Sequence, residues 1–537
     1  MAKSSGYSLL VAGLSQSVLM ILFLQLLVNP VFSQIQDNKA EENSYSYGWQ
    51  VRTGIATATQ MPFWMYSNQR GQIDKYSANA IFNFFGEWNH TYNSGISLES
   101  RANLLLRASD ESTVHLNEGY FGINYGGFNL WAGRKYENFG FVHPRLSTGS
   151  MEMSNNARPL PQIVFETDGF MPVPFFGGIL FADASLGHGW FTQGHGWIEI
   201  DPDNIDPDFE LPAVERDRYD EGVVHLHRKH LYLRIFNENA PLVLHGGLVH
   251  MAQWGGKSTS PVNFSSFLDV FFSRASDSTE ILSGGQLDNS SQNHFGVYDF
   301  AILVNLEEYT FALTRQFILE DTPNARFGAP WDGLWGLTLK RRAPNTSRSW
   351  RNQPESYRST GSHSRLHQRP DANFRPFLKT IHYEYLDLME GMSRFPHRPR
   401  DEYFNYYNHW IYRAGWTYFN QSIGNSLVTT DPNYLGVVNN EIIGHHIGLE
   451  GYAGKVLDWR FFATYTRNYG ANRVPVRNNP IIRDTLITER RDQWSFMLFM
   501  GSNRLFENVQ TEVSLAFDFG QLHPANAGIM LSLRWTP

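Results

Sequence analysis

Residues 509–520 read VQTEVSLAFDFG, and the polarity of their side chains alternates with a period of two. One face of an extended chain would carry the aliphatic and aromatic members, Val509, Val513, Leu515, Phe517 and Phe519. The other face would carry the polar or small members, Gln510, Glu512, Ser514, Asp518 and Gly520. Consecutive side chains on a strand point to opposite faces. The stretch therefore predicts a β-strand with one apolar and one polar face.

The same alternation recurs from about residue 78 to the end of the chain, most clearly at 96–107, 410–418, 457–466 and 529–535. A soluble β-sandwich also alternates. However, the polar faces carry full charges such as Arg101 and Glu512, which suits the wet lumen of a transmembrane barrel. Aromatic residues near the predicted strand ends are interpreted as membrane-interface girdles. These are Trp64, Tyr66, Tyr403 to Tyr407, and Trp494.

The composition agrees with this fold class. Aromatic residues make up 15% of the 537 residues, charged residues only 18%, and the mean hydropathy is −0.37. An alternating strand is never hydrophobic on average, so these values fit an all-β transmembrane antiparallel barrel. At roughly 25–30 residues per strand and its connections, the chain predicts an even number of strands near 18. The absence of Cys excludes disulfide scaffolds, thiolate metal sites and a cysteine nucleophile. The net charge of −8 gives no support for nucleic-acid binding.

Residues 1–33 have the pattern of a cleaved signal peptide. Lys3 precedes an apolar run at 18–28 that only Gln25 interrupts, and Val31-Phe32-Ser33 follows a helix-breaking Pro30. The alternative is a membrane anchor over 9–28. We expect a short segment at 34–50 and one barrel at 51–537, exported to the outer membrane of a two-membrane bacterium.

Two hydrophilic stretches interrupt the strand rhythm, an acidic loop at 199–221 and a basic loop at 340–373. Each is most simply a solvated loop. Arginines can also grip anionic sugars, and exposed aromatic rings suit the apolar faces of carbohydrates. The candidate polysaccharide-binding residues are therefore Arg341, Arg342, Arg348, Trp350, Arg351, Arg358, Trp254 and Trp331.

No local motif supports catalysis, a metal or a cofactor. His225, His227 and Lys229 alternate on one strand face, but a cation beside two histidines argues against a metal site. His445 and His446 fall on opposite faces. The chain has no Gly-x-Ser-x-Gly motif, P-loop or GxGxxG. We expect no enzyme, no metal and no cofactor.

Several segments together resemble the capsule-assembly Wzi family of outer-membrane proteins, in its Bacteroidetes-type form. The matching stretches are Pro62-Phe63-Trp64, Ser67 to Gly71, Ser147 to Met151, Ser154 to Pro161, His227 to Leu233, Gly246 to His250, Trp254 to Gly256, Asp332 to Gly336, Tyr403 to Tyr407, and Gly444 to Gly448. They occur in order over most of the predicted mature chain.

This resemblance implies an 18-stranded outer-membrane barrel that acts as a surface lectin and helps to attach capsular polysaccharide to the cell. The expected partners are that polysaccharide, outer-membrane lipid and the barrel-assembly machinery, and the barrel is expected to be a monomer. One alternative is a porin or channel for small solutes, which charged lumen faces would also suit. Another is an outer-membrane hydrolase of lipid or glycan. The basic loop is the predicted contact with an acidic glycan, provided that it faces outward.

Overall fold

The computed structural model describes the chain from Glu42 to Pro537 with gaps. The described residues are 42–191, 197–199, 218–220, 222–256, 262–272, 292–320, 327–343, 374–391, 405–409, 412, 414–430, 436–471, 487, 489–506 and 508–537. The predicted signal peptide lies outside these residues.

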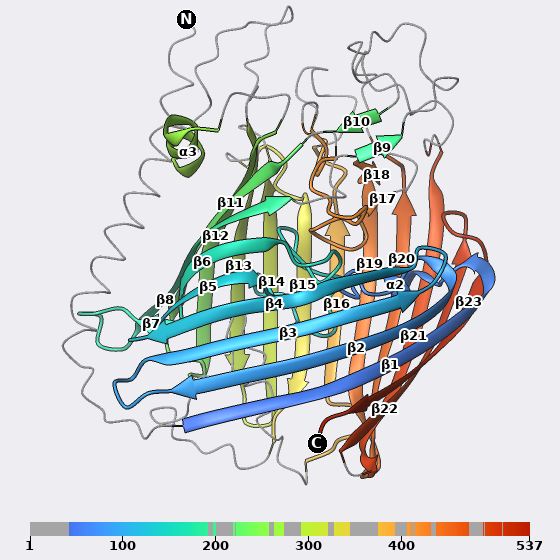
Figure 1. Cartoon of the computed structure of the whole chain (residues 1–537), viewed down its shortest axis with the longest axis horizontal. Coiled ribbons are helices and arrows are strands. Elements are labelled where there is room, and N and C mark those ends of the chain that lie inside the picture. The colour runs from blue at the N-terminus through green and yellow to red at the C-terminus, as the bar shows by residue number, and fades with distance from the viewer. Residues whose placement is uncertain are drawn as a thin grey trace, which may run out of the picture.

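One antiparallel sheet closes on itself to form the barrel (Figure 1). Its strands are β1 (Glu42–Gln60), β2 (Tyr76–Thr91), β3 (Ser97–Ala108), β4 (Thr113–Tyr125), β5 (Phe128–Arg134), β6 (Pro161–Thr167), β7 (Met171–Pro172), β8 (Leu180–Phe191), β11 (Val224–Ile235), β12 (Leu242–Gly255), β13 (Gln292–Asn305), β14 (Tyr309–Leu319), β15 (Gly333–Arg341), β16 (Thr380–Asp387), β19 (Ile442–Ala453), β20 (Leu457–Asn468), β21 (Arg491–Phe506), β22 (Val509–Gly520) and β23 (Asn526–Trp535). The sheet has 19 strands, of which the two-residue β7 pairs only with β8. The other 18 follow one another around the wall, and β1 pairs with both β2 and β23. The predicted fold class and even strand number are confirmed.

The remaining elements are small. Two helices, α2 (Phe63–Tyr66) and α3 (Phe264–Phe271), and two short hairpins, β9 (Trp197–Glu199) with β10 (Arg218–Asp220) and β17 (Thr429–Thr430) with β18 (Val437–Asn439), complete the described secondary structure. None of the helices in the described part of the chain is long and apolar enough to cross a membrane.

The two ends of the barrel differ in their connections. At one end, which we call the short-turn end, β1 begins and β23 ends, and most strands are joined by tight connections such as residues 126–127 and 454–456. The exception there is the basic segment between β15 and β16. At the opposite, long-loop end, the chain makes its longer excursions, including 135–160 and 388–441. Outer-membrane barrels have short periplasmic turns and long extracellular loops, so the short-turn end corresponds to the periplasmic side.

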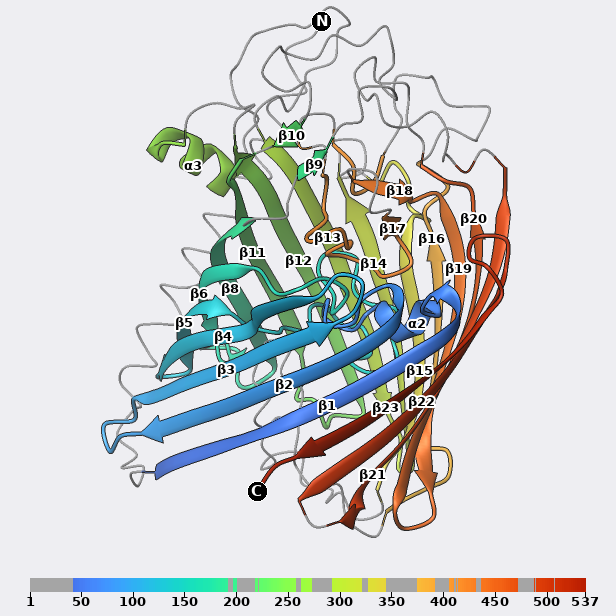
Figure 2. The same cartoon turned by 45° about the vertical axis from the view of Figure 1, so that its right-hand side comes forward.

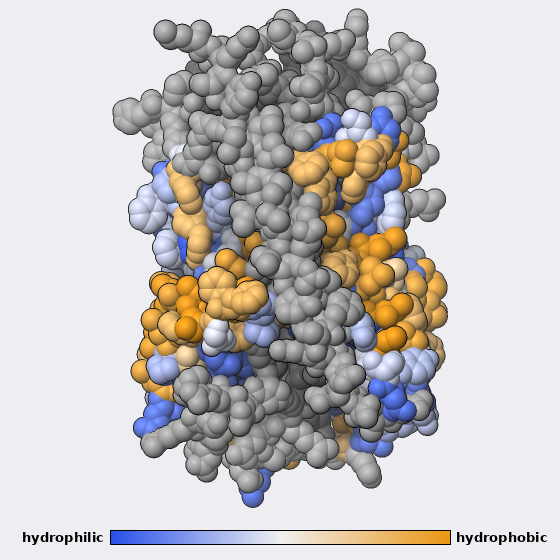
Figure 3. Space-filling model, turned by 90° about the vertical axis from the view of Figure 1, so that its left-hand side faces the viewer, coloured by the Kyte–Doolittle hydropathy of each residue, from blue (hydrophilic) through white to orange (hydrophobic). Residues whose placement is uncertain are grey.

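The outer wall is apolar around mid-height. On β22, Leu515, Phe517 and Phe519 are 41%, 47% and 41% exposed, whereas Asp518 between them is 1% exposed and faces the lumen. Figure 3 shows the same on the surface, where hydrophobic side chains gather in a belt with hydrophilic ones below it. The ring of Trp494 is 39% exposed and stacks on Phe496 and Phe519. Because apolar rings on this wall face lipid, Trp494 fits the predicted girdle.

Four of the predicted strand segments are strands, and one is not. Segments 96–107, 457–466, 509–520 and 529–535 correspond to β3, β20, β22 and β23. The alternating segment 410–418 was wrongly expected to be a strand, since its described residues Tyr412, Ala414, Trp416 and Tyr418 are all buried in irregular chain. Trp64, Tyr406 and Tyr407 are also at most 1% exposed, so they are lumen residues rather than girdle residues. Strand β1 begins at Glu42, upstream of the expected barrel boundary at residue 51.

Candidate functional site

Three segments from the long-loop end fold back into the barrel and fill its lumen. They are residues 61–75 with α2, residues 135–160, and residues 405–430 as far as these are described; together we call them the plug. Figure 2 shows α2 and the loop after β5 between the front strands β1–β4 and the strands behind them. Phe63, Leu146, Met151, Tyr407 and Trp416 of the plug are at most 5% exposed. The plug forms the center of the main hydrophobic cluster, so the lumen has a packed core.

Polar side chains of the wall hold the plug from many directions. The backbone N–H of Phe63 donates to Asp518 on β22 (2.7 Å), and the indole of Trp64 donates to Thr464 on β20 (2.9 Å). The N–H of Thr148 donates to Glu384 on β16 (2.8 Å). These three strands lie on one arc of the wall. On the opposite side, the N–H of Tyr136 donates to Glu118 on β4 (3.2 Å), so the plug is held across the lumen rather than at one edge.

A further attachment is a buried ion pair. Arg228 on β11 donates to Glu137 of the plug at 2.7 Å, and both side chains are 2% exposed. The Arg228 guanidinium also lies 4.7 Å from the ring center of Phe139. Each charge of this pair is buried away from water, and the opposite charge of its partner compensates for the lost hydration.

A shared amide links two buried carboxyl groups at another attachment. The side-chain nitrogen of Gln316 lies 3.2 Å from Glu152 Oε2 and 2.9 Å from Asp299 Oδ2. Burial raises the pKa of Glu152 from its ordinary value of 4.5 to about 7. The folded plug therefore retains a proton on Glu152 at pH values where an unfolded chain has released it.

This proton makes stability depend on pH. Stability falls as the unfolded state releases the proton before the folded state does, between about pH 4.5 and 7. We expect Glu152→Gln, which mimics the protonated group, to flatten this decline, which is on the order of 2–3 kcal/mol. Urea unfolding at pH 5 and pH 7 measures it, with Glu111→Gln at an exposed turn as the control. Equal pH dependence in the native protein and Glu152→Gln would contradict the assignment.

Between the plug and the short-turn end lies a cavity of about 310 Å³. We call it the arginine chamber, because its lining includes six arginines and one acid: Arg52, Arg70, Arg101, Arg145, Arg460, Arg534 and Glu512. Trp64 and Tyr136 of the plug close it on one side. Arg534 is the penultimate residue of β23, and Arg460 and Glu512 lie near the starts of β20 and β22, so its wall belongs to the short-turn half of the barrel.

A second feature lies at the long-loop end, where Trp331 is 63% exposed. The next residue, Asp332, is 1% exposed and accepts hydrogen bonds from the N–H groups of Glu390 and Gly391 and from the hydroxyl of Tyr406, each 2.7 Å long. The backbone N–H of Trp331 donates to the Glu390 carboxylate at 2.8 Å. These hydrogen bonds hold the exposed ring of Trp331 and the carboxylate of Glu390 next to each other. We call this group of residues the Trp331 platform.

The predicted binding residues do not form one site. Trp331 and Arg341 lie at opposite ends of β15, about 30 Å apart at ~3.4 Å per residue, and Arg342 follows Arg341 at the short-turn end. The basic loop was predicted to contact a glycan provided that it faces outward. Its described start, Arg341 and Arg342, lies at the short-turn end, so this condition is not met there. Arg348, Trp350, Arg351 and Arg358 lie outside the described residues, so their role stays a prediction.

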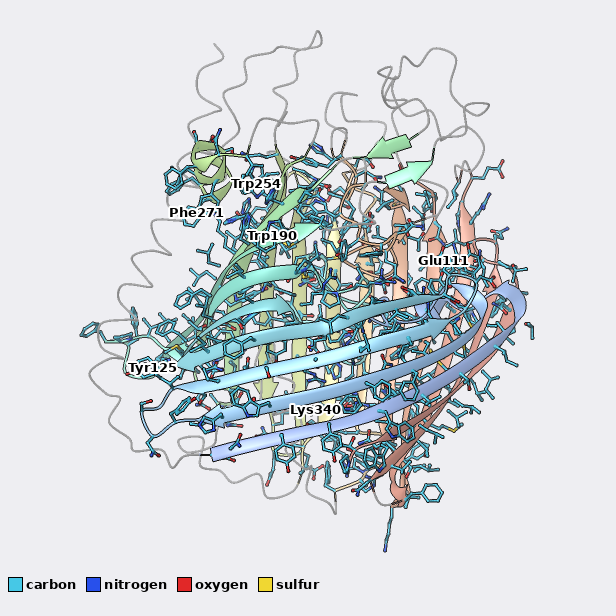
Figure 4. The ribbon with its side chains drawn as sticks, in the orientation of Figure 1. Glu111, Tyr125, Trp190, Trp254, Phe271 and Lys340 are labelled. Carbon is cyan, nitrogen blue, oxygen red and sulfur yellow. The ribbon has the colours of Figure 1, made fainter. Side chains whose placement is uncertain are left out.

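Trp254 is not an exposed ring. It is 4% exposed and packs against Val270 and Phe267 of α3 on the outer wall. Figure 4 shows Trp254 close to Trp190 and Phe271 in the upper part of the barrel, far from Lys340 in the lower part. A sugar could not reach this ring unless α3 moved.

The histidine predictions concern the same wall. His227 and Lys229 face outward beneath α3, where Lys229 donates to the carbonyl of Phe271, and Arg228 and His230 face the lumen. Within the described ranges no group of three or more His, Asp or Glu side chains is arranged to hold a metal ion.

Sequence reasoning missed the plug and the arginine chamber. The plug coincides with stretches that carry the family resemblance, including 62–71, 147–161 and the described part of 403–407. The chamber arginines Arg52, Arg101, Arg460 and Arg534 all occupy lumen-facing positions of strands. Period-two counting could have placed each on the lumen face, but not the four together.

Residues 43–191 match the family model of the capsule assembly protein Wzi. This match confirms the predicted resemblance over the first strands and much of the plug, whereas the Bacteroidetes-type branch stays a prediction. No curated protein matches the chain at a significant level.

Among solved structures, the chain is similar to Wzi of Escherichia coli, an outer-membrane protein involved in group 1 capsule assembly and described as a carbohydrate-binding β-barrel. The TM-score is 0.53 at 12% identity, over 94% of this chain and 86% of that chain. This likeness shows that the two share a fold. OprD of Pseudomonas aeruginosa aligns at 8% identity over 92% of this chain and 95% of that chain, with a TM-score of 0.43 that is too low to support an inference.

Proposed function

We propose that this chain, whose residues 43–191 match the Wzi family and whose barrel has the fold of the Escherichia coli Wzi, is a non-enzymatic outer-membrane protein that binds surface polysaccharide at its long-loop end. The Escherichia coli protein is described as a carbohydrate-binding barrel involved in capsule assembly. The observation that carries the proposal here is the plug. A lumen filled by a packed core and bonded to the wall on several sides suits a binding protein better than a diffusion channel.

The Trp331 platform is the described feature that best fits a sugar contact. An exposed indole offers an apolar face to the C–H groups of a sugar ring, and the neighboring Glu390 carboxylate offers acceptors to its hydroxyls. The buried Asp332 hydrogen bonds hold the ring's backbone in place, which lowers the entropy lost on binding.

Retention of polysaccharide on cells tests this function. A strain lacking the gene should still synthesize the polysaccharide but release it into the medium. Re-expression of the native chain should restore retention, and Trp331→Ala should restore it several-fold less, because loss of one stacking ring costs about 1–3 kcal/mol of contact energy. Bound and released polysaccharide are measured by sugar assay of pellets and supernatants.

Phe175→Ala is the matched control, since Phe175 is 94% exposed but lies in the connection before β8 at the short-turn end. This variant should retain polysaccharide as the native chain does. Normal retention in the strain lacking the gene would overturn the proposed function. Normal retention with Trp331→Ala alone would remove the platform as the contact.

The remaining parts of the proposal concern its setting. We propose that the chain is exported with cleavage after residue 33, is inserted by the barrel-assembly machinery and works as a monomer in outer-membrane lipid. It needs no cofactor. The porin alternative requires an open lumen, and the described plug residues argue against one.

A further inference from the structure

We propose that the arginine chamber is a binding site for an acidic sugar, which it holds by its carboxylate or phosphate and admits from the short-turn side. This goes beyond the proposed function, because a surface lectin requires contacts only at the opposite, long-loop end.

The first argument is the charge balance. Arg101 is paired with Glu118 at 2.8 Å and with Glu87 at 3.8 Å, Arg460 with Glu512 at 3.7 Å, and Arg145 with Glu450 at 3.6 Å. Among the described residues, no carboxylate lies within ion-pair distance of Arg52 or Arg534, and the Nε atom of each is buried without a hydrogen-bond partner. The lining therefore holds more positive guanidinium charge than the nearby carboxylates neutralize. A bound oxyanion would balance the remaining positive charge.

The second argument is the fixed orientation of the guanidinium groups. Arg534 lies 4.3 Å from the ring center of Phe85, Arg460 lies 4.2 Å from that of Phe499, and Arg70 lies 4.3 Å from that of Tyr136. Stacking on an aromatic face holds the planar group while its N–H edge can still donate. Such a preorganized fork matches the two oxygens of a carboxylate or phosphate.

The backbone beside the chamber is strained in a way that supports this arrangement. Arg70 has a φ of 61° and Asn68 a φ of 55°, in the left-handed region that side chains other than glycine rarely adopt. The turn persists because the N–H of Arg70 donates to Asn155 O (2.5 Å) and that of Gly71 to Asn156 O (3.0 Å). Strain of this kind costs about 1–3 kcal/mol and clusters at binding sites.

Size and remaining chemistry indicate a sugar rather than a bare ion. The volume of about 310 Å³ is in the range of small-ligand pockets. Amide side chains for hydroxyl groups come from Gln50, Asn68 and Asn103, and rings for an apolar sugar face come from Trp64 and Phe462.

The position of the chamber gives the direction of entry. The plug separates it from the long-loop end, whereas Arg145, which lines it, has a side chain that is 55% exposed. A positive cavity with low-dielectric walls concentrates anions. The acidic sugar would therefore come from the periplasmic side.

Calorimetry on the purified full chain in detergent tests the proposal with three probes: digalacturonate, glucose 1-phosphate and maltose. We expect at least one of the two acids to bind and maltose to bind at least tenfold more weakly. The double variant Arg52→Gln/Arg534→Gln should weaken binding of that acid at least tenfold. The matched control is Arg490→Gln, which removes one exposed guanidinium at the long-loop end beside Asp492, and it should bind like the native chain.

The acid that binds more tightly identifies the anion as carboxylate or phosphate. A heat-modifiability shift on electrophoresis shows that each variant is folded. Equal binding of acids and maltose, no binding of either acid, or unchanged binding in the folded double variant would each overturn the proposal. Binding to the chamber and retention of polysaccharide on cells are separate measurements, so either proposal can fail without the other.

Discussion

A barrel in which two-residue Asn-Gly turns replace residues 135–160 and 388–442 should conduct ions steadily, whereas the native protein should not. These replacements remove two of the three plug segments. Arg134 pairs with Pro161 and Asp387 with Ile443 in the sheet, so a tight hairpin turn can join each pair of strands without changing the register. A barrel of 18 strands is wide enough for an aqueous channel once most of its lumen is cleared.

The lumen wall is suited to water once these two plug segments are removed. Asp299, Glu384 and Arg228 face inward and now bond to plug residues. Planar-bilayer recording of the purified proteins measures the effect as single-channel steps of porin size in the variant. The control replaces only residues 92–96, because Thr91 pairs with Ser97 at the short-turn end and no plug residue is removed. Large, stable steps from the native chain would contradict the closed lumen and favor the porin alternative.

Glu137→Gln should destabilize the protein by about 3–5 kcal/mol, because it leaves the buried guanidinium of Arg228 without a counter-charge. The free energy of unfolding in urea, measured in detergent or lipid, gives this effect. The control is Asp458→Asn. Asp458 also has a short ion pair, 2.6 Å from Arg375, but its side chain is 43% exposed, so its loss should cost no more than about 1 kcal/mol.

The pair can also be removed as a whole. The double variant Glu137→Leu/Arg228→Met should recover much of the stability lost in Glu137→Gln, because no buried charge is left unpaired. Equal, small losses for Glu137→Gln and Asp458→Asn would mean that water reaches the Glu137–Arg228 pair, and the plug would then be looser than its packing indicates.

Much of the wall could be predicted from the sequence, because each strand faces lipid on one side and polar groups on the other. The surroundings of the side chains alternate between lipid and lumen from one residue to the next. The alternating polarity of residues 509–520 was therefore enough to predict a strand. The segment 410–418 defeated the same reasoning. Its alternating aromatic residues are buried inside the lumen, where large rings are also favored, and the pattern alone does not distinguish lipid from a packed core.

The site was less predictable for the same reason. Trp331 is exposed at the long-loop end, whereas Trp254, chosen for the same kind of ring, is covered by α3. Arg341 and Arg342 lie at the end opposite to Trp331 because β15 runs between them. The order of side-chain types along the chain does not show at which end of the barrel a given residue lies.

The sequence by itself determined a closed antiparallel barrel near 18 strands with an apolar outer wall, since this depends on a period of two and on chain length. Only the tertiary structure decided that the lumen is plugged, and that four strands and two loop segments bring six arginines to one chamber. The physical reason is that alternation is set by local contacts with lipid or water. Plug and chamber are made by contacts between residues hundreds of positions apart, such as Phe63 with Asp518.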